Sequence, residues 1–503
     1  MDSKQRLALR IAVLTSFIPF YGESMITLLL PVIGRELGGG LALQQWIANG
    51  YMLTLGSFIL IGGSISDLFG RLKILRFGLI AFGLISILCA IAPNGTFLII
   101  ARLVQGATAA LLLPSSLALI ADFIPGKQFS KAIGSRTAWT SIALLIGPLL
   151  GGLFVDTLNW RLAFAANLIP IIVTLWLLRR LSGSLPDNNR THADIKGSLL
   201  CAIALSGIVF ALIEQAHLGW SHPLIVCSLS LGLVIFAFFI RHEMRSRHPM
   251  LPLRLFAIRN FAMGNITTLT VYGGLTVWGF AMALFLQQVA GYSALASGLS
   301  LAPVTLVMFL GSARVGVLSQ RFGPRGLITT GSLVAAAGIG LLALNIDTSV
   351  EYVSDILPGM LIFGLGVTLT ATPLTAAVLE AVPRTRSGIA SAVNNAVVSI
   401  AGLLAIAVIG IVLAAQFNNT IEKNIAKSDL SPTSRQALNT IKQRSPEAAT
   451  PAGVPLSEVQ SLQQILREAS VNSYRTGMVW IATAVAAGGL IAMVWIRNER
   501  PAR

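Results

Sequence analysis

Residues 46–92 read WIANGYMLTLGSFILIGGSISDLFGRLKILRFGLIAFGLISILCAIA, and this stretch decides which kind of fold the chain can adopt. Two apolar runs, Trp46–Ser66 and Ile74–Ala92, flank a short segment that contains Asp67 and Arg71. A helix needs roughly 20 apolar residues to cross the hydrocarbon core of a bilayer. Each run is long enough to do so, and the charged segment between them is therefore expected to be a turn at the membrane surface.

The composition of the whole chain agrees with a membrane protein. Of its 503 residues, 54% are hydrophobic and only 11% are charged, and the mean hydropathy is +0.77. A soluble chain would carry charge on about a quarter of its residues, and a disordered chain would have low hydrophobicity. Three cysteines are too few for a disulfide scaffold. These values indicate an all-α polytopic membrane protein, because helices satisfy their own backbone hydrogen bonds in lipid.

Apolar runs recur along the chain and predict fourteen transmembrane helices. The longest connection between them, residues 418–475, is polar. Within it we expect short amphipathic helices at Gln436–Lys442 and Glu458–Glu468, and a mobile Pro- and Ala-rich segment at Ser445–Pro455. The predicted spans are Leu9–Ile33, Trp46–Ser66, Ile74–Ala92, Phe97–Ile120, Ala132–Phe154, Leu162–Leu181, Gly197–His217, Pro223–Ile240, Phe261–Val289, Ala296–Leu318, Gly326–Leu344, Leu357–Val382, Gly388–Phe417 and Thr476–Ile496.

The net charge of +16 is explained by the predicted topology. If the helices alternate in direction, most of the 36 lysines and arginines fall on the side of the N-terminus, whereas the short loops on the other side hold only Arg35 and Arg161. Basic residues accumulate on the cytoplasmic side of membrane proteins. We therefore expect a multi-pass protein of the bacterial inner membrane with both termini in the cytoplasm, and not a nucleic-acid-binding protein.

Two turns on that side have related sequences. The segments Gly63–Lys73, after the second run, and Gly316–Arg325, after the tenth, both contain a glycine, a polar residue four positions later, and then a glycine close to an arginine. Repeated halves with a substrate site at their interface are typical of secondary transporters. We expect an N-terminal six-helix half at residues 1–183, a linker with two inserted helices at 184–245, and a C-terminal six-helix half at 246–503.

Two further motifs lie on the fourth and fifth predicted helices. Residues 102–106 read RLVQG, and residues 147–152 read GPLLGG. Together with the turn at 63–71, they resemble the major facilitator superfamily, and specifically its fourteen-helix drug:proton antiporters. The resemblance implies the major facilitator fold with two six-helix halves and an inserted helix pair. It also implies a monomer that uses a proton gradient and no cofactor.

The first helix departs from that family, which has L-D-x-T-I-V-N-V-A-L-P at this place. The family's aspartate falls on Gly22 here, and a carboxylate follows one residue later at Glu23. Glu23 is the only acidic residue deep in a predicted span, and an ionisable group at that depth costs roughly 2.5–3.5 kcal/mol and usually faces a cavity. We expect Glu23 to carry a proton and to attract a cationic substrate. The alternative is a structural glutamate that packs against Ser24 or Thr27.

Arg102 lies in the outer part of the fourth predicted helix. We expect it to face the cavity, where it would tune proton uptake or pair with a carboxylate, with Gln105 supporting it. The alternative is an arginine that extends to the membrane interface.

The remaining candidates are expected to control opening and closing. Asp67, Gly70 and Arg71, with Gly63 in the same motif, would form a latch, in which Arg71 pairs across the interface between the halves. The alternative is a local turn with topological charges. On the fifth helix, small residues allow close approach and a proline removes a backbone hydrogen bond. They would form a seal between the halves, or ordinary helix packing, and are Gly147, Pro148, Gly151 and Gly152.

Aromatic and amide side chains within the spans leave two interpretations open. The aromatic rings can hold a cation or anchor the chain at the membrane interface. The amides Asn49, Asn394 and Asn395 can line the cavity or tie helices together. The aromatic candidates are Phe17, Phe20, Tyr21, Trp46, Tyr51, Trp139 and Trp278.

Several motifs are absent from the sequence. It has no G-x-x-x-x-G-K-[ST] loop for a nucleotide and no constellation of catalytic residues, so we expect no enzyme activity. Its histidines do not have the spacing of a metal site, and we therefore predict none. They are His192, His217, His222, His242 and His248.

These observations predict a proton-coupled exporter of amphipathic, monovalent cationic drugs, antiseptics or dyes, working by alternating access in the lipid bilayer. One alternative is a proton-coupled transporter of a specific metabolite, siderophore or lipid. The other is a membrane sensor or scaffold without transport activity.

Overall fold

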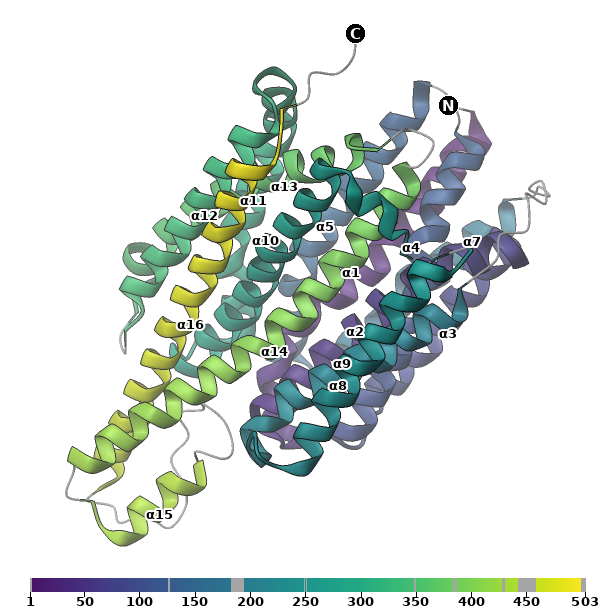
Figure 1. Cartoon of the computed structure of the whole chain (residues 1–503). Coiled ribbons are helices and arrows are strands. Elements are labelled where there is room, and N and C mark those ends of the chain that lie inside the picture. The colour runs from purple at the N-terminus through teal and green to yellow at the C-terminus, as the bar shows by residue number, and fades with distance from the viewer. Residues whose placement is uncertain are drawn as a thin grey trace.

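The computed structural model is a bundle of long helices, and the described residues contain no β-strand. Figure 1 shows that α1 begins and α16 ends at the same end of the bundle, which we call the terminal end. We call the opposite end, near which α15 lies, the distal end. The structure describes residues 2–124, 127–181, 194–247, 249, 251–347, 350–382, 387–427, 430–441 and 458–498.

The helices follow one another in three groups. The N-terminal group consists of α1 (Ser3–Leu37), α2 (Gly40–Phe69), α3 (Arg71–Ala90), α4 (Gly95–Phe123), α5 (Lys127–Thr157), α6 (Trp160–Ala166) and α7 (Leu168–Arg180). The inserted pair is α8 (Ile195–Leu218) and α9 (Pro223–Arg245). The C-terminal group consists of η1 (Leu253–Ala257), α10 (Arg259–Leu284), η2 (Phe285–Val289), α11 (Ala294–Phe322), α12 (Pro324–Asn345), η3 (Tyr352–Ile356), α13 (Leu357–Glu380), α14 (Ser387–Lys427), α15 (Pro432–Ile441) and α16 (Val459–Trp495).

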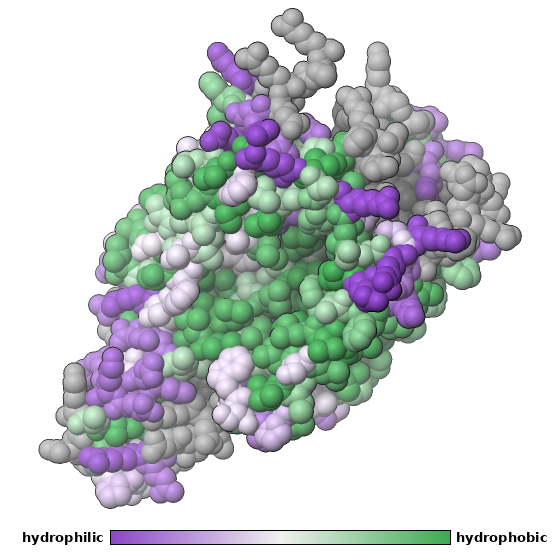
Figure 2. All heavy atoms as spheres, in the orientation of Figure 1, coloured by the Kyte–Doolittle hydropathy of each residue, from purple (hydrophilic) through white to green (hydrophobic). Residues whose placement is uncertain are grey.

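The number of long helices agrees with the prediction. Over the described residues, 12 spans are long and apolar enough to cross a membrane, with α6 and α7 counted together. The helices α2 and α5, of 30 and 31 residues, pack in the same bundle against α4 and α1. Together these make 14 long helices and confirm the predicted fold class. Figure 2 shows hydrophobic residues over the middle of one face and hydrophilic residues toward its ends, as expected for a multi-pass membrane protein.

The sixth span is broken into two helices. Asn167 lies between the end of α6 and the start of α7, and it is fully buried. Its Nδ2 donates a hydrogen bond to the Phe164 carbonyl at 3.2 Å. An asparagine side chain competes with the helix for backbone groups. Asn167 nevertheless keeps helical angles (φ −58°, ψ −25°), and α6 and α7 together form the one span that the apolar run predicts.

Two helices extend much farther than predicted. The sequence predicts that the thirteenth helix ends at Phe417, but α14 has 41 residues and continues to Lys427. At about 1.5 Å per residue, a helix of that length is roughly twice as long as the ~30 Å hydrocarbon core. The predicted short helix Glu458–Glu468 is not separate, because α16 begins at Val459 and continues into the last span. The predicted mobile segment Ser445–Pro455 lies outside the described residues.

The distal ends of α14 and α16 form a small extension together with α15. The short helix α15 covers most of the predicted amphipathic segment Gln436–Lys442, whose last residue lies outside the described part. The extension has its own apolar core, separate from that of the bundle, formed by Phe417, Ile421, Leu430, Leu438, Leu462, Ile465, Leu466 and Ala469. This core explains why both helices continue past the bundle, since each buries one apolar face there.

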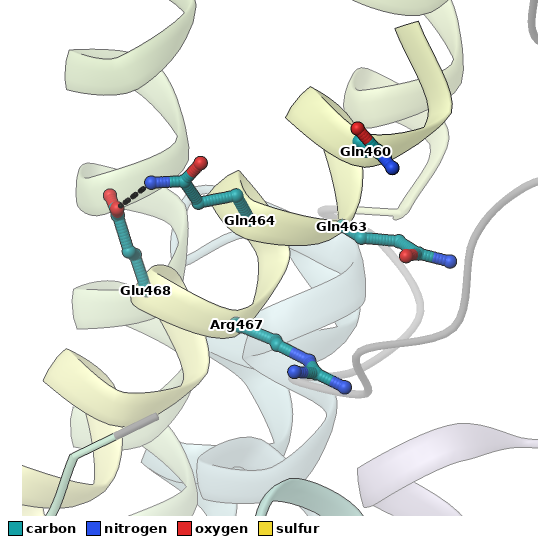
Figure 3. A pocket seen from close by; sticks show the side chains of 5 residues that line it. All are labelled: Gln460, Gln463, Gln464, Arg467 and Glu468. Carbon is teal, nitrogen blue, oxygen red and sulfur yellow. Dashed lines mark hydrogen bonds between the residues drawn. The ribbon is translucent and has the colours of Figure 1, made fainter. Parts of the chain in front are cut away.

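One face of the extension carries a polar cavity of about 340 Å³ (Figure 3). The five described residues that line it belong to α16, and Gln464 Nε2 donates a hydrogen bond to Glu468 Oε1 at 3.0 Å. Because the lining contains no aromatic or aliphatic side chain, this cavity does not suit an amphipathic molecule. The lining residues are Gln460, Gln463, Gln464, Arg467 and Glu468.

The two related turns have the same geometry. In the first half, Gly70 stands between α2 and α3 with φ of 94°. In the second half, Gly323 stands between α11 and α12 with φ of 82°. Only glycine adopts these angles readily. The internal repeat in the sequence is therefore a structural repeat, with one sharp turn at the same place in each half.

The N- and C-terminal groups meet along two helix pairs, α2 with α14 and α5 with α11. At the distal end, Gln45 Nε2 donates a hydrogen bond to the Ile406 carbonyl at 2.6 Å. The Asp156 carboxylate accepts hydrogen bonds from the N–H groups of Ala294 and Leu295, at 3.1 and 2.8 Å, at the start of α11. Gln287 of η2 also reaches the first half, where it donates to the carbonyl of Leu28 at 3.2 Å. These contacts hold the two groups together at the distal end.

Candidate functional site

Glu23 lies within α1, a helix of 35 residues, and its side chain keeps part of its surface accessible. Its neighbours Tyr21, Gly22 and Met25 are buried. Glu23 and Arg102 act on each other electrostatically, and so do Glu23 and Tyr51. Because both partners are fully buried inside the bundle, Glu23 faces the interior and not the lipid.

Arg102 of α4 is enclosed by protein and does not extend to the membrane interface. Only 1% of its surface is exposed. Its Nε donates a hydrogen bond to the Ile47 carbonyl at 3.2 Å, and its Nη1 donates to Gln105 Oε1 at 2.7 Å. The guanidinium carbon lies 4.3 Å from the ring centre of Tyr51. The structure therefore excludes the alternative in which Arg102 extends to the membrane interface.

The third guanidinium nitrogen of Arg102 has no such partner. Its Nη2 is buried and makes no hydrogen bond within the described part of the chain. A buried cation that lacks part of its hydrogen bonding is costly unless an opposite charge lies close by. Glu23 provides that charge without forming a direct hydrogen bond, so its carboxylate stays available to a proton or a ligand.

Gln105 supports Arg102, as the sequence predicts. It is 1% exposed, accepts the bond from Arg102 through Oε1, and donates from Nε2 to Ser86 Oγ at 2.9 Å. Cys89 Sγ lies 3.9 Å from the same Oε1. Gln105 thus joins α3 to α4 and fixes the position of the guanidinium, and it lies too deep in the packing to touch a ligand in this state.

The structure also shows what lies beside Gly22, where the family has aspartate. A Cβ atom at this position would lie 3.6 Å from Asn167 Oδ1 and 3.8 Å from the Phe82 ring. Position 22 therefore faces α3 and the break between α6 and α7. One step along a helix turns a side chain by about 100°, so Glu23 occupies a different face of α1 from position 22.

The motif on α5 contacts both halves of the protein. A Cβ atom at Gly147 would lie 1.9 Å from Ser24 Oγ, and one at Gly151 would lie 3.0 Å from the Met25 carbonyl oxygen, both on α1. A Cβ atom at Gly152 would instead lie 2.5 Å from the Cα atom of Leu295 on α11.

Pro148 belongs to the contact between the halves as well. A Cβ atom at Gly298 of α11 would lie 2.8 Å from the Pro148 carbonyl oxygen. Gly147 and Gly151 thus pack within their own half, whereas Pro148 and Gly152 lie against the other half. The role of these residues as a seal stays a prediction.

One contact of the turn motif lies within the N-terminal half. Arg71 forms an ion pair with Asp122 at the end of α4, in the same half, where we expected a pair across the interface. A Cβ atom at Gly63 would lie 3.5 Å from Pro114 Cβ, so this glycine serves the packing of α2 on α4. Asp67 lies in the last turn of α2, and its side chain is outside the described part.

Arg136 is a functional candidate that sequence reasoning missed, because it was counted among the topological charges. Its Nε donates hydrogen bonds to Ser16 Oγ at 2.6 Å and to Ser116 Oγ at 3.1 Å. It is thus held between α1, α4 and α5, and it is only partly exposed. No local pattern separates such an arginine from one at the membrane surface.

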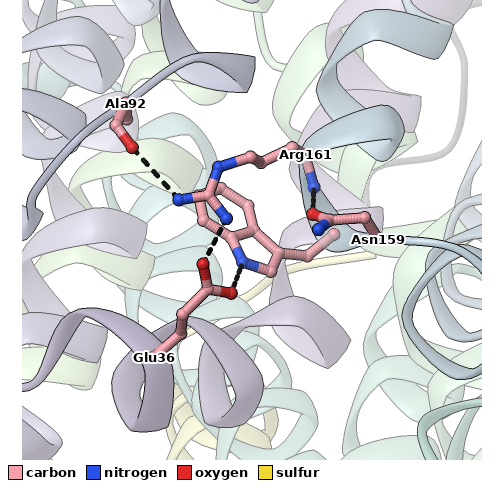
Figure 4. A network of polar contacts seen from close by, with 5 residues as sticks. Glu36, Ala92, Asn159 and Arg161 are labelled. Atoms are coloured by element: carbon pink, nitrogen blue, oxygen red, sulfur yellow. Dashed lines mark hydrogen bonds and ion pairs between the residues drawn. The ribbon is translucent and has the colours of Figure 1, made fainter.

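A second network fixes the distal end of α1 (Figure 4). Glu36 accepts a hydrogen bond from Trp160 Nε1 at 2.5 Å and forms an ion pair with Arg161. Arg161 covers the Trp160 ring at 4.2 Å and donates to the Ala92 carbonyl at 3.3 Å. Asn159 caps the start of α6 by accepting from the backbone N–H of Arg161 at 2.9 Å. This network joins α1 and α6 to the loop after α3.

The structure decides between the two interpretations for some aromatic and amide residues. Trp46 Nε1 donates to Glu214 Oε1 at 2.9 Å and joins α2 to α8. Asn394 Nδ2 donates to Asn265 Oδ1 at 3.2 Å and to Thr268 Oγ1 at 3.1 Å, which ties α14 to α10. These side chains connect helices and are not free to hold a ligand.

Comparison with known proteins agrees with this geometry. The sequence profile of the family described as Major Facilitator Superfamily matches residues 12–406. The multidrug resistance protein Stp of Mycobacterium tuberculosis (strain CDC 1551 / Oshkosh) is 33% identical over 444 residues, which cover 88% of this chain and 82% of that protein. The puromycin resistance protein pur8 of Streptomyces alboniger is 33% identical over 401 residues, covering 77% and 78%.

A solved structure shows the same fold. The bacterial homologue of the human lysosomal transporter Spinster, in an inward-facing and unoccupied conformation, matches with a TM-score of 0.71 and 16% identity over 100% of both chains. Its helices are thus arranged like those described above.

Proposed function

The chain belongs to the major facilitator superfamily, and from this premise we propose that it exports amphipathic toxic compounds in exchange for protons. It is a multi-pass membrane transporter of small molecules. The names of its relatives support a drug as cargo, since they include a multidrug resistance protein, a puromycin resistance protein and a tetracenomycin C resistance and export protein.

One observation carries the proton coupling in this proposal. Glu23 is a partly buried glutamate inside α1, and it lies close enough to the buried Arg102 for the two charges to interact. We propose that this carboxylate is the group that exchanges a proton for the cationic substrate, because an ionisable side chain inside a span usually serves transport. Glu23 can therefore bind either a proton or a cationic substrate, and each weakens the binding of the other.

The contacts between the halves support a direction of transport. Gln45, Asp156 and Gln287 make hydrogen bonds between the N- and C-terminal groups toward the distal end. We propose that the terminal end faces the cytoplasm, as the basic residues indicate. In this state Glu23 would be reached from the cytoplasm, and rocking of the halves would open the distal end.

A single deep carboxylate also limits the cargo. We expect monovalent cations and neutral molecules to be exported better than divalent cations, because only one negative charge is available to neutralise them. A specific metabolite, siderophore or lipid remains the alternative cargo class.

Growth of a pump-deficient bacterial host that expresses the protein tests both the role of Glu23 and the class of cargo. We expect the wild type to raise resistance to monovalent quaternary ammonium compounds and cationic dyes, and Glu23→Gln to abolish most of that gain. Glu214→Gln is the matched control, since this glutamate binds Trp46 outside the proposed site. Equal resistance of the wild type and Glu23→Gln to every compound would contradict the proposal.

A further inference from the structure

The inserted helix pair carries three ionisable side chains that meet at the terminal end. Asp194 precedes α8, and His242 and Glu243 lie in the last turns of α9. One potential ligand atom of each side chain lies within 4.8 Å of the other two. They come together because α8 and α9 are antiparallel and pack closely along their length.

The three side chains are held by hydrogen bonds to one another and to the backbone. His242 Nε2 lies 2.9 and 3.1 Å from the two oxygens of Asp194. Asp194 Oδ1 also accepts a hydrogen bond from the Gly197 N–H at 2.8 Å. Glu243 Oε2 accepts one from the Leu251 N–H at 2.7 Å, beyond the end of α9.

The second oxygen of Glu243 supports a bound ligand independently of the spacing of the three side chains. Only 3% of the Glu243 surface is exposed, and Oε1 is buried with no hydrogen-bond partner within the described part of the chain. A buried carboxylate oxygen without a partner is costly, and a second carboxylate beside it adds like-charge repulsion. The cluster is therefore complete only when the two carboxyl groups share a proton, which couples Glu243 to Asp194, or when a cation takes the place of that proton.

Gly197 provides the space in which the two carboxylates meet. A Cβ atom at this position would lie 2.4 Å from Glu243 Oε1 and 2.8 Å from Asp194 Oδ2. The first turn of α8 thus carries its glycine directly under both oxygens, and any larger side chain would push them apart.

We propose that Asp194, His242 and Glu243 bind a divalent transition-metal cation, with Zn²⁺ as the best fit. One imidazole nitrogen and two carboxylate oxygens are a ligand set that zinc accepts, with a fourth position for water. A tetrahedral zinc ion with ligands about 2.1 Å away separates the ligand atoms by about 3.4 Å. The ligand atoms now lie within 4.8 Å of one another, so the side chains would move closer together on binding.

The cation would clamp the inserted pair at the point where the chain enters and leaves it. Asp194 holds the start of α8, while Glu243 holds the end of α9 and, through Leu251, the segment that leads to the C-terminal group. This role is independent of the proposed proton exchange, because the cluster contains none of the residues assigned to that exchange.

Zinc titration of the purified full-length chain, carrying an affinity tag without histidine, tests the proposal by calorimetry. We expect one Zn²⁺ per chain and a higher melting temperature with zinc present. Asp194→Asn keeps a side chain that caps α8, and Glu243→Gln keeps the acceptor for Leu251. Each should weaken zinc binding by at least about tenfold.

His222→Gln is the matched control, since this histidine lies at the opposite end of α9 and should leave zinc affinity within about twofold of the wild type. Mg²⁺ should bind far more weakly, because it prefers oxygen ligands alone. The proposal is overturned if the wild type binds no stoichiometric zinc, or if Asp194→Asn and Glu243→Gln bind it as tightly as the wild type.

Discussion

At the scale of single residues, the carboxylate in α1 stands one position away from its place in the fourteen-helix antiporters that the sequence resembles. The sequence shows that Glu23 is the deep carboxylate, but it cannot show which face of α1 the side chain occupies. The structure answers this through packing, since position 22 meets Asn167 while Glu23 interacts with Arg102. One step along a helix turns a side chain by about 100°, so the two positions are not interchangeable.

Moving the carboxylate back to the family position tests this difference. We expect Gly22→Asp combined with Glu23→Gln to be as inactive in drug efflux as Glu23→Gln alone, because an aspartate at 22 would face Asn167 and Phe82. Glu23→Asp should keep part of the efflux, since it leaves the charge on the correct face. Fluorescent-dye efflux from whole cells measures all three variants, and full recovery in the double variant would contradict the assignment.

At the scale of helices, the lengths and order of most spans follow from hydropathy, whereas their interruptions and extensions do not. The break at Asn167 depends on one buried amide. The extension of α14 and α16 depends on apolar residues such as Phe417 and Leu462 that pack only when the two helices meet. Such contacts join residues far apart in the sequence, and a local pattern cannot reveal them.

The α5 motif leads to a prediction at this scale. Gly152→Ala should place a Cβ against the α11 backbone and keep the distal end from closing, because Leu295 Cα lies only 2.5 Å away. Efflux should fall severalfold, and the distance between spin labels at the distal ends of α5 and α11 should increase. Gly147→Ala is the control, since it strains the packing on α1 inside one half. An unchanged label distance in Gly152→Ala would argue against the seal.

The extension should respond to acid through Glu458, just before α16. Hydrogen bonds from Ser434 and Ser431 hold the pKa of Glu458 below its ordinary value, so the charged carboxylate favours the docked α15. This stabilisation is complete above the unfolded pKa of about 4.3 and is lost as the pH falls through the lowered folded value. The protection of α15 against hydrogen exchange, corrected for the pH dependence of the intrinsic exchange rate, should drop as the pH falls through this range.

The matched variant is Glu458→Gln, in which the titrating group is removed. Its α15 should be less protected at neutral pH and should show no further loss between pH values of about 5 and 3. If the wild type and this variant lose protection in parallel over that range, Glu458 does not control the docking of α15.

At the scale of the whole molecule, the number of long helices and the internal repeat were predictable, because each leaves a periodic signal in the chain. The turn glycines Gly70 and Gly323 are an example, because a few residues in the sequence were enough to predict the repeated turn. The enclosed position of Arg136 and the cluster around His242 were not predictable. Asp194 and His242 are 48 positions apart, and only the packing of α8 against α9 brings them together.

The central claim is that Glu23 couples drug export to protons, and transport in proteoliposomes tests it most directly. With the terminal end outward and an acidic lumen, the wild type should accumulate a monovalent cationic dye, and the accumulation should disappear when the pH gradient is collapsed. Glu23→Gln should show no accumulation beyond that of empty vesicles, although Glu214→Gln should behave like the wild type. Accumulation by Glu23→Gln that equals the wild type and still depends on the pH gradient would contradict the claim.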